Sequence, residues 1–494
     1  MSATEPGTAP PDDTRLSPQL IKLAVVVMLG ALAIQLDGTV ISVAIEALKR
    51  EFNASLAELQ WVGTGYLLAL ALVIPLAGWS AQRVGARRMW LISLTMFLVG
   101  SLMCGLSWSL WSLVVFRLLQ GFGGGLIMPL GQAILIQEAG VARRGKLMSV
   151  FAVPAILGPV LGPVVGGVFV TDISWRWIFF INVPICLIAL WLSWRVVPDT
   201  DFGKRSKLDV LGLSLLSPGL VALVYALSQA GNNGNFSDKK VVIPLILGVL
   251  LVLGYAWHAL RPKVAPIIDI RLFRFRSFTS ATLVLFFFST VAFGAALLLP
   301  LFFQEVRGMT AFEAGIRIIP FGVGTTVALM VAGKLTDSLP ARWIVAVSLV
   351  CAVAGFGILT QIEPDTNGLL LALAMVLIGL GAGAVQVSVT TAAFVGLNKE
   401  TIPRASSAVR IMTQLGSSAG AATLFVVLQR ELNKLIAGGP VTQHGLAHTF
   451  QVVFWWTVAF AGIALVVSLF LPSTAFKQSP DAEPAEAAPA AAEH

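Results

Sequence analysis

Four glycines and two prolines stand within ten residues of one another in the stretch Gly158-Pro159-Val-Leu-Gly162-Pro163-Val-Val-Gly166-Gly167. The stretch lies inside an uninterrupted apolar run from about Val150 to Val170, in which Pro154 precedes it by one turn. In water such a helix would be unstable, because each glycine costs about 1 kcal/mol and each proline about 3 kcal/mol relative to alanine. Inside a bilayer these residues are tolerated, and glycines let a second helix approach closely. The stretch therefore predicts a membrane helix with a close-packed seam.

The composition also indicates an integral membrane protein. Hydrophobic residues make up 57% of the 494 residues, and charged residues make up only 12%, against about a quarter in ordinary soluble domains. The net charge of +8 comes from short loops rather than from one helix face. This distribution argues for membrane topology and against a nucleic-acid-binding surface. We expect an all-α membrane protein embedded in the lipid bilayer.

Apolar segments long enough to cross a bilayer, about 20 residues each, recur along the chain. We count fourteen, and an even count places both termini on one side. With that side taken as the cytoplasm, inner segments hold 22 of the 33 lysines and arginines and outer loops hold 8. This asymmetry predicts cytoplasmic termini in the cell membrane. The expected spans lie near residues 21–46, 61–80, 89–107, 109–136, 147–170, 177–195, 209–228, 241–259, 278–303, 313–333, 342–360, 368–396, 405–429 and 450–471.

A weak internal repeat divides the chain into two halves. The segment Gly78-Trp-Ser-Ala-Gln82-Arg-Val-Gly85-Ala-Arg87 aligns with Gly333-Lys-Leu-Thr-Asp337-Ser-Leu-Pro340-Ala-Arg342, and each follows the second span of its half. Parallel halves of this kind place a substrate site near the bilayer midplane. The expected organisation is a disordered tail at 1–20, a six-helix bundle at 21–200, two additional spans at 201–262, a second six-helix bundle at 263–472 and a disordered tail at 473–494.

Two charged residues fall inside spans of the first half. Asp37 lies about two-thirds of the way across the first span, and Arg117 lies at a similar depth in the fourth. A charge at such a depth costs several kcal/mol unless it faces a partner or a cavity. We therefore expect the two side chains to form a pair in which the carboxylate takes up and releases protons. Two alternatives remain: Asp37 as a surface acid near its helix end, and the pair as a static salt bridge.

The order and spacing of several segments resemble the fourteen-helix drug:proton antiporters of the major facilitator superfamily, and the likeness covers nearly the whole chain. That resemblance implies two six-helix bundles with two inserted helices, a small-molecule substrate and protons as partners. It also implicates Arg117 in proton transfer. The segments that carry it are Leu36-Asp37-Gly-Thr39-Val40, Gln60-Trp61 with Tyr66, Arg117 to Gly123, Gly158 to Gly167, Trp175 to Pro184 and Pro266 to Phe273.

In the antiporters that this chain resembles, the loop after the second span is the cytoplasmic gating loop. It usually carries an aspartate where this chain has Gln82, which can accept a hydrogen bond but brings no charge. We expect the gate to be weaker, or to depend on the second half of the chain. The residues expected to form it are Gly78, Gln82, Arg83, Gly85, Arg87, Arg88 and Asp337.

Seven polar residues within or beside the spans are candidates for a central cavity. Hydrogen bonding between helices explains each glutamine about equally well. The candidates are Gln35, Tyr66, Gln120, Gln132, Gln304, Gln386 and Gln414.

The sequence offers little support for an enzyme. It has no metal-ligand cluster, no nucleophile–base pair and no G-x4-G-K-[ST] loop, so we expect neither a cofactor nor a bound metal. The expected function is secondary active export of hydrophobic or cationic small molecules in exchange for protons, by alternating access. The alternatives are a dedicated exporter of one endogenous metabolite or lipid, and a membrane sensor or scaffold that does not transport. A periplasmic adaptor is an expected partner if the chain comes from a double-membraned bacterium.

Overall fold

A computed structural model describes residues 17–139, 143–199, 207–261, 266–335, 339–397 and 400–471. Within these ranges the regular structure is entirely helical. The elements are α1 (Pro18–Phe52), α2 (Leu56–Val73), α3 (Leu76–Val84), α4 (Ala86–Gly105), α5 (Leu110–Ala139), α6 (Arg144–Val168), η1 (Phe169–Ile173), α7 (Trp177–Phe180), α8 (Asn182–Val196), α9 (Val210–Asn233), α10 (Lys239–Ala259), η2 (Ile270–Arg274), α11 (Arg276–Leu301), η3 (Phe302–Val306), α12 (Ala311–Leu335), α13 (Ala341–Leu359), α14 (Gly368–Ala393), α15 (Ile402–Ala437) and α16 (Gln443–Ser468).

Among the described residues, eleven helices are long and apolar enough to cross a membrane, and the bent pair α2 and α3 makes a twelfth. The described apolar parts of α6 and α11 are shorter, at Gly145–Pro154 and Arg276–Ala292. The all-helical membrane fold is thus confirmed, whereas the predicted count of fourteen spans is only partly confirmed.

The second span bends by 55° between α2 and α3. Pro75 stands at the break and has no N–H to continue the helical hydrogen bonds, which is the usual cause of a sharp kink. A carbonyl freed near a break needs another donor in a bilayer. The hydroxyl of Ser217 on α9 donates to the carbonyl of Leu72 at 2.8 Å. The inserted helix α9 therefore satisfies the backbone at this kink.

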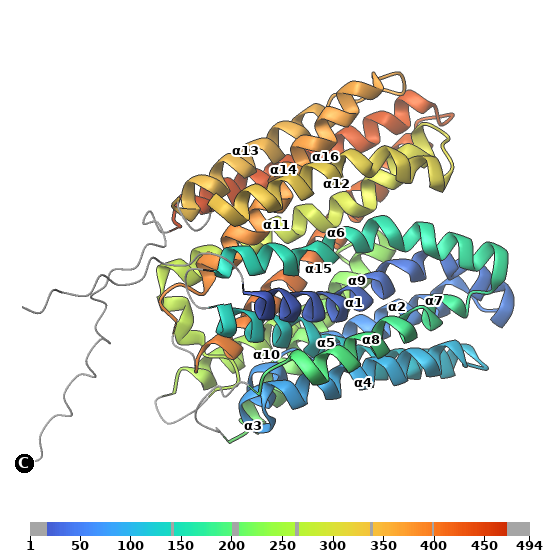
Figure 1. Ribbon diagram of the computed structural model, residues 1–494. Helices are drawn as coiled ribbons and strands as arrows, with labels where there is room; N and C mark the ends of the chain where they lie inside the picture. The colour runs from blue at the N-terminus through green and yellow to red at the C-terminus, as the bar shows by residue number, and fades with distance from the viewer. Residues whose placement is uncertain are drawn as a thin grey trace, which may run out of the picture.

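Figure 1 shows two helix bundles, one formed by α1 to α8 and the other by α11 to α16, with α15 leaning toward the first bundle. The start of α1 and the end of α16 lie at the same end of the molecule. We call this end the termini side and the opposite end the far side. Toward the far side the ribbons of the two bundles diverge (Figure 1).

Helix α9 lies along both bundles. On α2, the rings of Trp61 and Tyr225 stack with centroids 6.1 Å apart. On α15, a Cβ added at Gly231 would lie 3.4 Å from the Cα of Ala422, so the two backbones are in ordinary contact. Of the predicted pair of additional helices, α9 thus lies beside the boundary between the bundles rather than on the outside of one of them.

The described parts of the two bundles meet on the termini side at two equivalent places, among other contacts. Helix α3 packs on the first turns of α15, where a Cβ at Gly78 would lie 3.1 Å from the backbone of Arg404. The end of α12 meets the start of α6, where a Cβ at Gly333 would lie 3.1 Å from Ser149 Oγ. Because α3 and α12 hold equivalent places in the two halves, the paired contacts reproduce the internal repeat seen in the sequence.

The side of the membrane reached by each loop is testable. Reporter fusions after Lys146 and after Arg276 are expected to read the same side as a fusion at the C-terminus, and fusions after Asn232 and after His444 the opposite side. This follows from the alternation of the helices between the two sides (Figure 1). The measurement is reporter activity at equal expression. A fusion after Asn232 that reported the termini side would exclude α9 and α10 as a membrane-crossing pair.

A candidate functional site around Asp37 and Arg117

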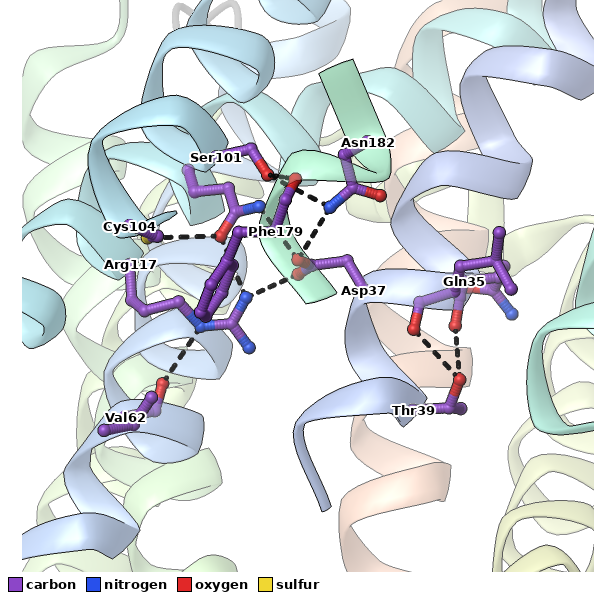
Figure 2. Close-up of polar contacts among 11 residues, drawn as sticks. Gln35, Asp37, Thr39, Val62, Ser101, Cys104, Arg117, Phe179 and Asn182 are labelled. Atoms are coloured by element: carbon purple, nitrogen blue, oxygen red, sulfur yellow. Dashed lines mark hydrogen bonds and ion pairs between the residues drawn. The ribbon is translucent and has the colours of Figure 1, made fainter. Parts of the chain in front are cut away.

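Asp37 and Arg117 form a buried ion pair between α1 and α5. Arg117 Nη1 lies 2.6 Å from Asp37 Oδ2, and both side chains are 1% exposed. Figure 2 shows the two side chains pointing toward each other between their helices. The structure therefore brings together the two charged residues that the sequence placed at similar depth.

Both oxygens of the carboxylate accept hydrogen bonds. Oδ2 accepts from Arg117, and Oδ1 accepts from Gln120 Nε2 at 2.9 Å and from Asn182 Nδ2 at 3.1 Å. The Gln120 oxygen in turn accepts from Arg117 Nη1 at 2.8 Å. Hydrogen bonds to an ionised acceptor are about twice as strong as neutral ones. The surroundings are thus built for the ionised form of Asp37.

The guanidinium of Arg117 is held by more than the carboxylate. Its Nε donates to the carbonyl of Val62 on α2 at 3.4 Å, and its Cζ lies 4.5 Å from the centre of the Tyr66 ring. The ring of Phe179 lies 5.4 Å away. Aromatic faces stabilise a cation by about 2 kcal/mol when it is desolvated. Arg117 is therefore held as a cation by two helices besides α1.

A short polar chain extends from Asn182 to α4. The Asn182 amide donates to Ser101 Oγ at 3.1 Å, and Ser101 donates to the carbonyl of Phe179 at 2.9 Å (Figure 2). Two buried atoms nearby, Asn182 Oδ1 and the Tyr66 hydroxyl, have no hydrogen-bond partner among the described residues. The site thus combines a satisfied ion pair with two free polar atoms.

The stability of this arrangement depends on both groups keeping their charge. Breaking a buried ion pair by neutralising one partner costs about 3–5 kcal/mol, because the other charge is left uncompensated. Protonation of Asp37 would leave Arg117 in that position. This cost of about 3–5 kcal/mol is enough to change the ratio of two conformational states by more than a hundredfold.

The glycine-rich helix α6 packs directly on the part of α1 that carries Asp37. Thr39 Oγ1 lies 2.9 Å from the carbonyl of Gly158. A Cβ at Gly158 would lie 2.8 Å from Gln35 Cβ, and one at Gly162 would lie 2.9 Å from Thr39 Cβ. Real Cβ atoms do not approach so closely, so this seam requires glycine. Since Gln35 and Thr39 flank Asp37, the seam and the ion pair share one stretch of α1.

The other seam residues differ in their surroundings. Pro154 and Gly166 are buried, whereas a Cβ at Gly167 would meet nothing within 4 Å. The side chains of Pro159 and Pro163 lie outside the described set. Among the seam glycines whose neighbours the structure describes, the close contacts are those of Gly158 and Gly162.

A second candidate feature, the termini-side latch, consists of Gly78 and Gln82 on α3 with Glu400, Arg404 and Ser407 at the start of α15. The Gln82 amide donates to the carbonyl of Glu400 at 2.8 Å, and its oxygen accepts from Arg404 at 3.3 Å. The Gly78 N–H donates to Ser407 Oγ at 3.2 Å. Gln82 thus links the two bundles through both ends of its amide.

The remaining residues of the predicted gating loop lie apart from this latch. Arg83 and Arg88 are exposed, and Arg87 donates to the carbonyl of Trp194 within the first bundle. Gly85 separates α3 from α4 with a φ of 98°, which glycine adopts without strain. Asp337 lies outside the described residues.

The predicted cavity residues fall into different surroundings. Gln120 belongs to the ion-pair network, Gln132 is buried, and Gln304 of η3 donates to the carbonyl of Pro300 near the end of α11. Tyr66 is buried, and its ring lies against the guanidinium of Arg117. The half-buried members are Gln35, Gln386 and Gln414.

Several residues of the site were missed in the sequence. Asn182 lies within a segment that the resemblance quoted, and a polar amide in an apolar span was the available signal. Ser101 gave no signal, because serine is common in membrane helices. Glu400, Arg404 and Ser407 follow Gln82 by more than 300 positions, and their contact with it depends on the tertiary fold. The described residues contain no group of three His, Cys, Asp or Glu that would hold a metal.

The seam predicts a contrast between two glycines of one helix. Gly162→Ala is expected to lower the free energy of unfolding by about 1–3 kcal/mol, because the new methyl group would collide with Thr39. Gly167→Ala, the matched control, has open space and is expected to be neutral or to stabilise α6 by up to about 1 kcal/mol. The measurement is unfolding of the purified protein in detergent, followed by tryptophan fluorescence. Equal midpoints for the two variants would contradict the seam.

Comparison with known proteins agrees with this architecture. The family model described as Major Facilitator Superfamily matches residues 27–421. The "Multidrug resistance protein B homolog" of Mycobacterium tuberculosis is 34% identical over 93% of this chain and 91% of its own length. The "Multidrug export protein EmrB" of Escherichia coli K12 is 30% identical over 81% of this chain and 79% of its own length. Among solved structures, a double-tryptophan mutant of XylE aligns with a TM-score of 0.67 and 18% identity, covering 93% of this chain and 97% of that one. The chain belongs to the major facilitator superfamily of transporters.

Proposed function

We propose that this protein exports hydrophobic small molecules of several kinds from the cytoplasm in exchange for protons. The observation that carries the proposal is the buried Asp37–Arg117 pair, which shares a stretch of α1 with the glycine seam. Relatives named for multidrug resistance and multidrug export support this choice among transport functions.

Asp37 is the proposed proton carrier and Arg117 its partner. In the ionised state Asp37 is occupied by three donors, so it is not free to bind a cationic substrate directly. A cationic substrate, which the sequence also leads us to expect, would have to displace one of these donors to reach Asp37. Protonation would release Arg117 from the carboxylate, while Gln120 and Asn182 can still bond to the neutral acid.

The termini-side latch is the proposed cytoplasmic gate. The excess of lysine and arginine in the segments on this side favours the cytoplasm. Because the described contacts of the latch join the bundles on this side, we assign the described state to the outward-facing stage of alternating access. Opening toward the cytoplasm would require Gln82 to leave Glu400 and Arg404.

The overall function is tested by efflux. Cells that express the chain are loaded with a panel of unrelated hydrophobic dyes, and dye loss is followed with and without a protonophore. Protonophore-sensitive export of several dyes is expected. Export of a single compound would instead indicate a dedicated exporter, and the absence of any flux at normal membrane expression would indicate a sensor or scaffold.

Proton coupling is tested at the ion pair. Asp37→Asn is expected to abolish dye-induced proton release from inverted vesicles, because it removes the titratable group. It also leaves Arg117 unpaired at a cost of about 3–5 kcal/mol. The double variant Asp37→Asn/Arg117→Gln removes both charges, so it is expected to recover stability without recovering proton release.

The matched control is Asp172→Asn, which neutralises an exposed acid of the first bundle and is expected to leave proton release unchanged. Proton release by the double variant at the wild-type rate would show that the ion pair is only a structural salt bridge.

A further inference from the structure

Four arginines gather where the inserted helices join the second bundle, and neither the ion pair nor the latch uses them. We call them the basic joint: Arg261 after α10, Arg271 and Arg274 on the 3-10 helix η2, and Arg276 at the start of α11. Three of them are exposed, and Arg271 is half-buried. The joint therefore presents a concentrated positive charge on the surface of the protein.

The segment before η2 is fixed to α10 by one buried side chain. The hydroxyl of Tyr255 donates to the carbonyl of Ile268 at 2.7 Å and accepts from the N–H of the same residue at 2.8 Å. Tyr255 is 2% exposed, so both bonds are shielded from solvent. Asp269 then caps η2 by accepting from the N–H of Arg271 at 2.9 Å. The position of η2 beside the end of α10 is thus determined by the fold.

This geometry places the arginines close together. Side chains three residues apart eclipse in a 3-10 helix, so Arg271 and Arg274 share one face of η2. The guanidinium of Arg271 donates to the carbonyl of Arg261 at 3.1 Å. The Cζ of Arg276 lies 5.6 Å from the centre of the Phe470 ring, just beyond the end of α16. The joint consequently lies on the termini side, where α10, α11 and α16 come together.

The charge of the joint is not neutralised within the described part of the chain. No described carboxylate forms an ion pair with any of its four arginines. The two acids that interact with neighbouring Tyr255 are engaged elsewhere. Asp269 caps η2, and Asp209 caps α9 and bonds to His258 at 2.8 Å. The joint therefore attracts anions from its surroundings.

Large apolar side chains border the joint and are also exposed. Trp257 is 68% exposed, and the Cζ of Arg261 lies 3.9 Å from the centre of its ring. Phe275 and Phe470 are about half exposed. At a membrane surface, aromatic rings lie at the level of the headgroups, and arginines reach from apolar surroundings to the phosphates. Apolar surface beside unpaired guanidinium groups matches a molecule that has acyl chains and an anionic head.

We propose that the basic joint binds an anionic phospholipid of the leaflet on the termini side, with its acyl chains along Trp257 and Phe470. Guanidinium groups donate to phosphate oxygens in charge-assisted hydrogen bonds. A zwitterionic lipid carries its own cation, so it gains less from the joint than an anionic lipid does. The bound lipid would connect the end of α10 to the start of α11. The inference concerns a partner of the inserted helices and does not depend on which molecules are exported.

The experiment compares two lipids with the same acyl chains. Purified full-length protein in detergent receives equal amounts of phosphatidylglycerol and phosphatidylcholine, and the lipids that it retains are counted by native mass spectrometry. Wild type is expected to retain phosphatidylglycerol in about tenfold excess. Glycerol phosphate at the concentration of the lipid is expected to leave this excess unchanged, because it lacks the acyl chains.

Two triple variants remove the same number of charges from different places. Arg271→Gln/Arg274→Gln/Arg276→Gln is expected to reduce the excess to about twofold or less while retention of phosphatidylcholine stays unchanged. The control, Lys239→Gln/Lys240→Gln/Arg430→Gln, neutralises three exposed cations of the far side and is expected to keep the wild-type excess. Unchanged phosphatidylcholine retention shows that each variant still presents a folded apolar surface.

Three results would overturn the proposal. Equal retention of both lipids by wild type would exclude a preference for the anionic head. An equal loss of preference in the two triple variants would assign it to overall charge rather than to the joint. Displacement of phosphatidylglycerol by glycerol phosphate would assign the joint to a soluble anion instead of a lipid.

Discussion

The pairing of Asp37 with Arg117 is the constraint on which the first bundle depends. Neither charge is stable alone inside a bilayer, so α1 and α5 must meet at one depth. The remaining polar groups of the pair bond to other helices: Arg117 donates to the carbonyl of Val62 on α2, and Asp37 accepts from Asn182 on α8. Asn182 in turn donates to Ser101 on α4. Five helices are thus tied to one another through a single carboxylate and its partner. The apolar residues around them fill space, but they do not by themselves fix which helices are neighbours at this depth.

The same stretch of α1 leads outward to the second bundle. Gln35 and Thr39 lie against the glycines of α6, and α6 in turn meets the end of α12 through Ser149 and Gly333. The proton-binding candidate is therefore contiguous with a contact between bundles, through backbones that approach too closely to adjust independently. Close-packed interfaces tend to switch between discrete arrangements rather than deform continuously. The glycines matter here because they make the α1–α6 contact stiff.

How much the sequence could predict varied with the range of the interaction. Asp37 and Arg117 were predictable as a pair, because depth in a span follows from counting residues and charges in lipid need partners. The close packing of Gly158 and Gly162 was predictable too, although the identity of the opposing helix was not. For Gln120 the sequence left open a cavity position or a hydrogen bond between helices, because its direction depends on the rotation of α5; the side chain bonds to Asp37 on α1. The partners of Gln82 could not be predicted, because they lie more than 300 positions away and meet Gln82 only in the folded structure.

The position of α9 has a mechanical consequence. It touches α2 and α15 at once, so any rotation of one bundle against the other must shear α9 along at least one of them. The two surfaces resist sliding differently. Slip on α2 breaks the buried hydrogen bond from Ser217 to Leu72, a loss of about 0.5–1.5 kcal/mol, and separates the stacked rings of Trp61 and Tyr225. Slip on α15 disturbs apolar packing instead, because Gly231 lies on Ala422 and Ala230 clusters with Ala422 and Val426. The inserted helix is therefore held to the first bundle by directional bonds and to the second by apolar packing, and a rotation of one bundle against the other must break one of these two sets of contacts.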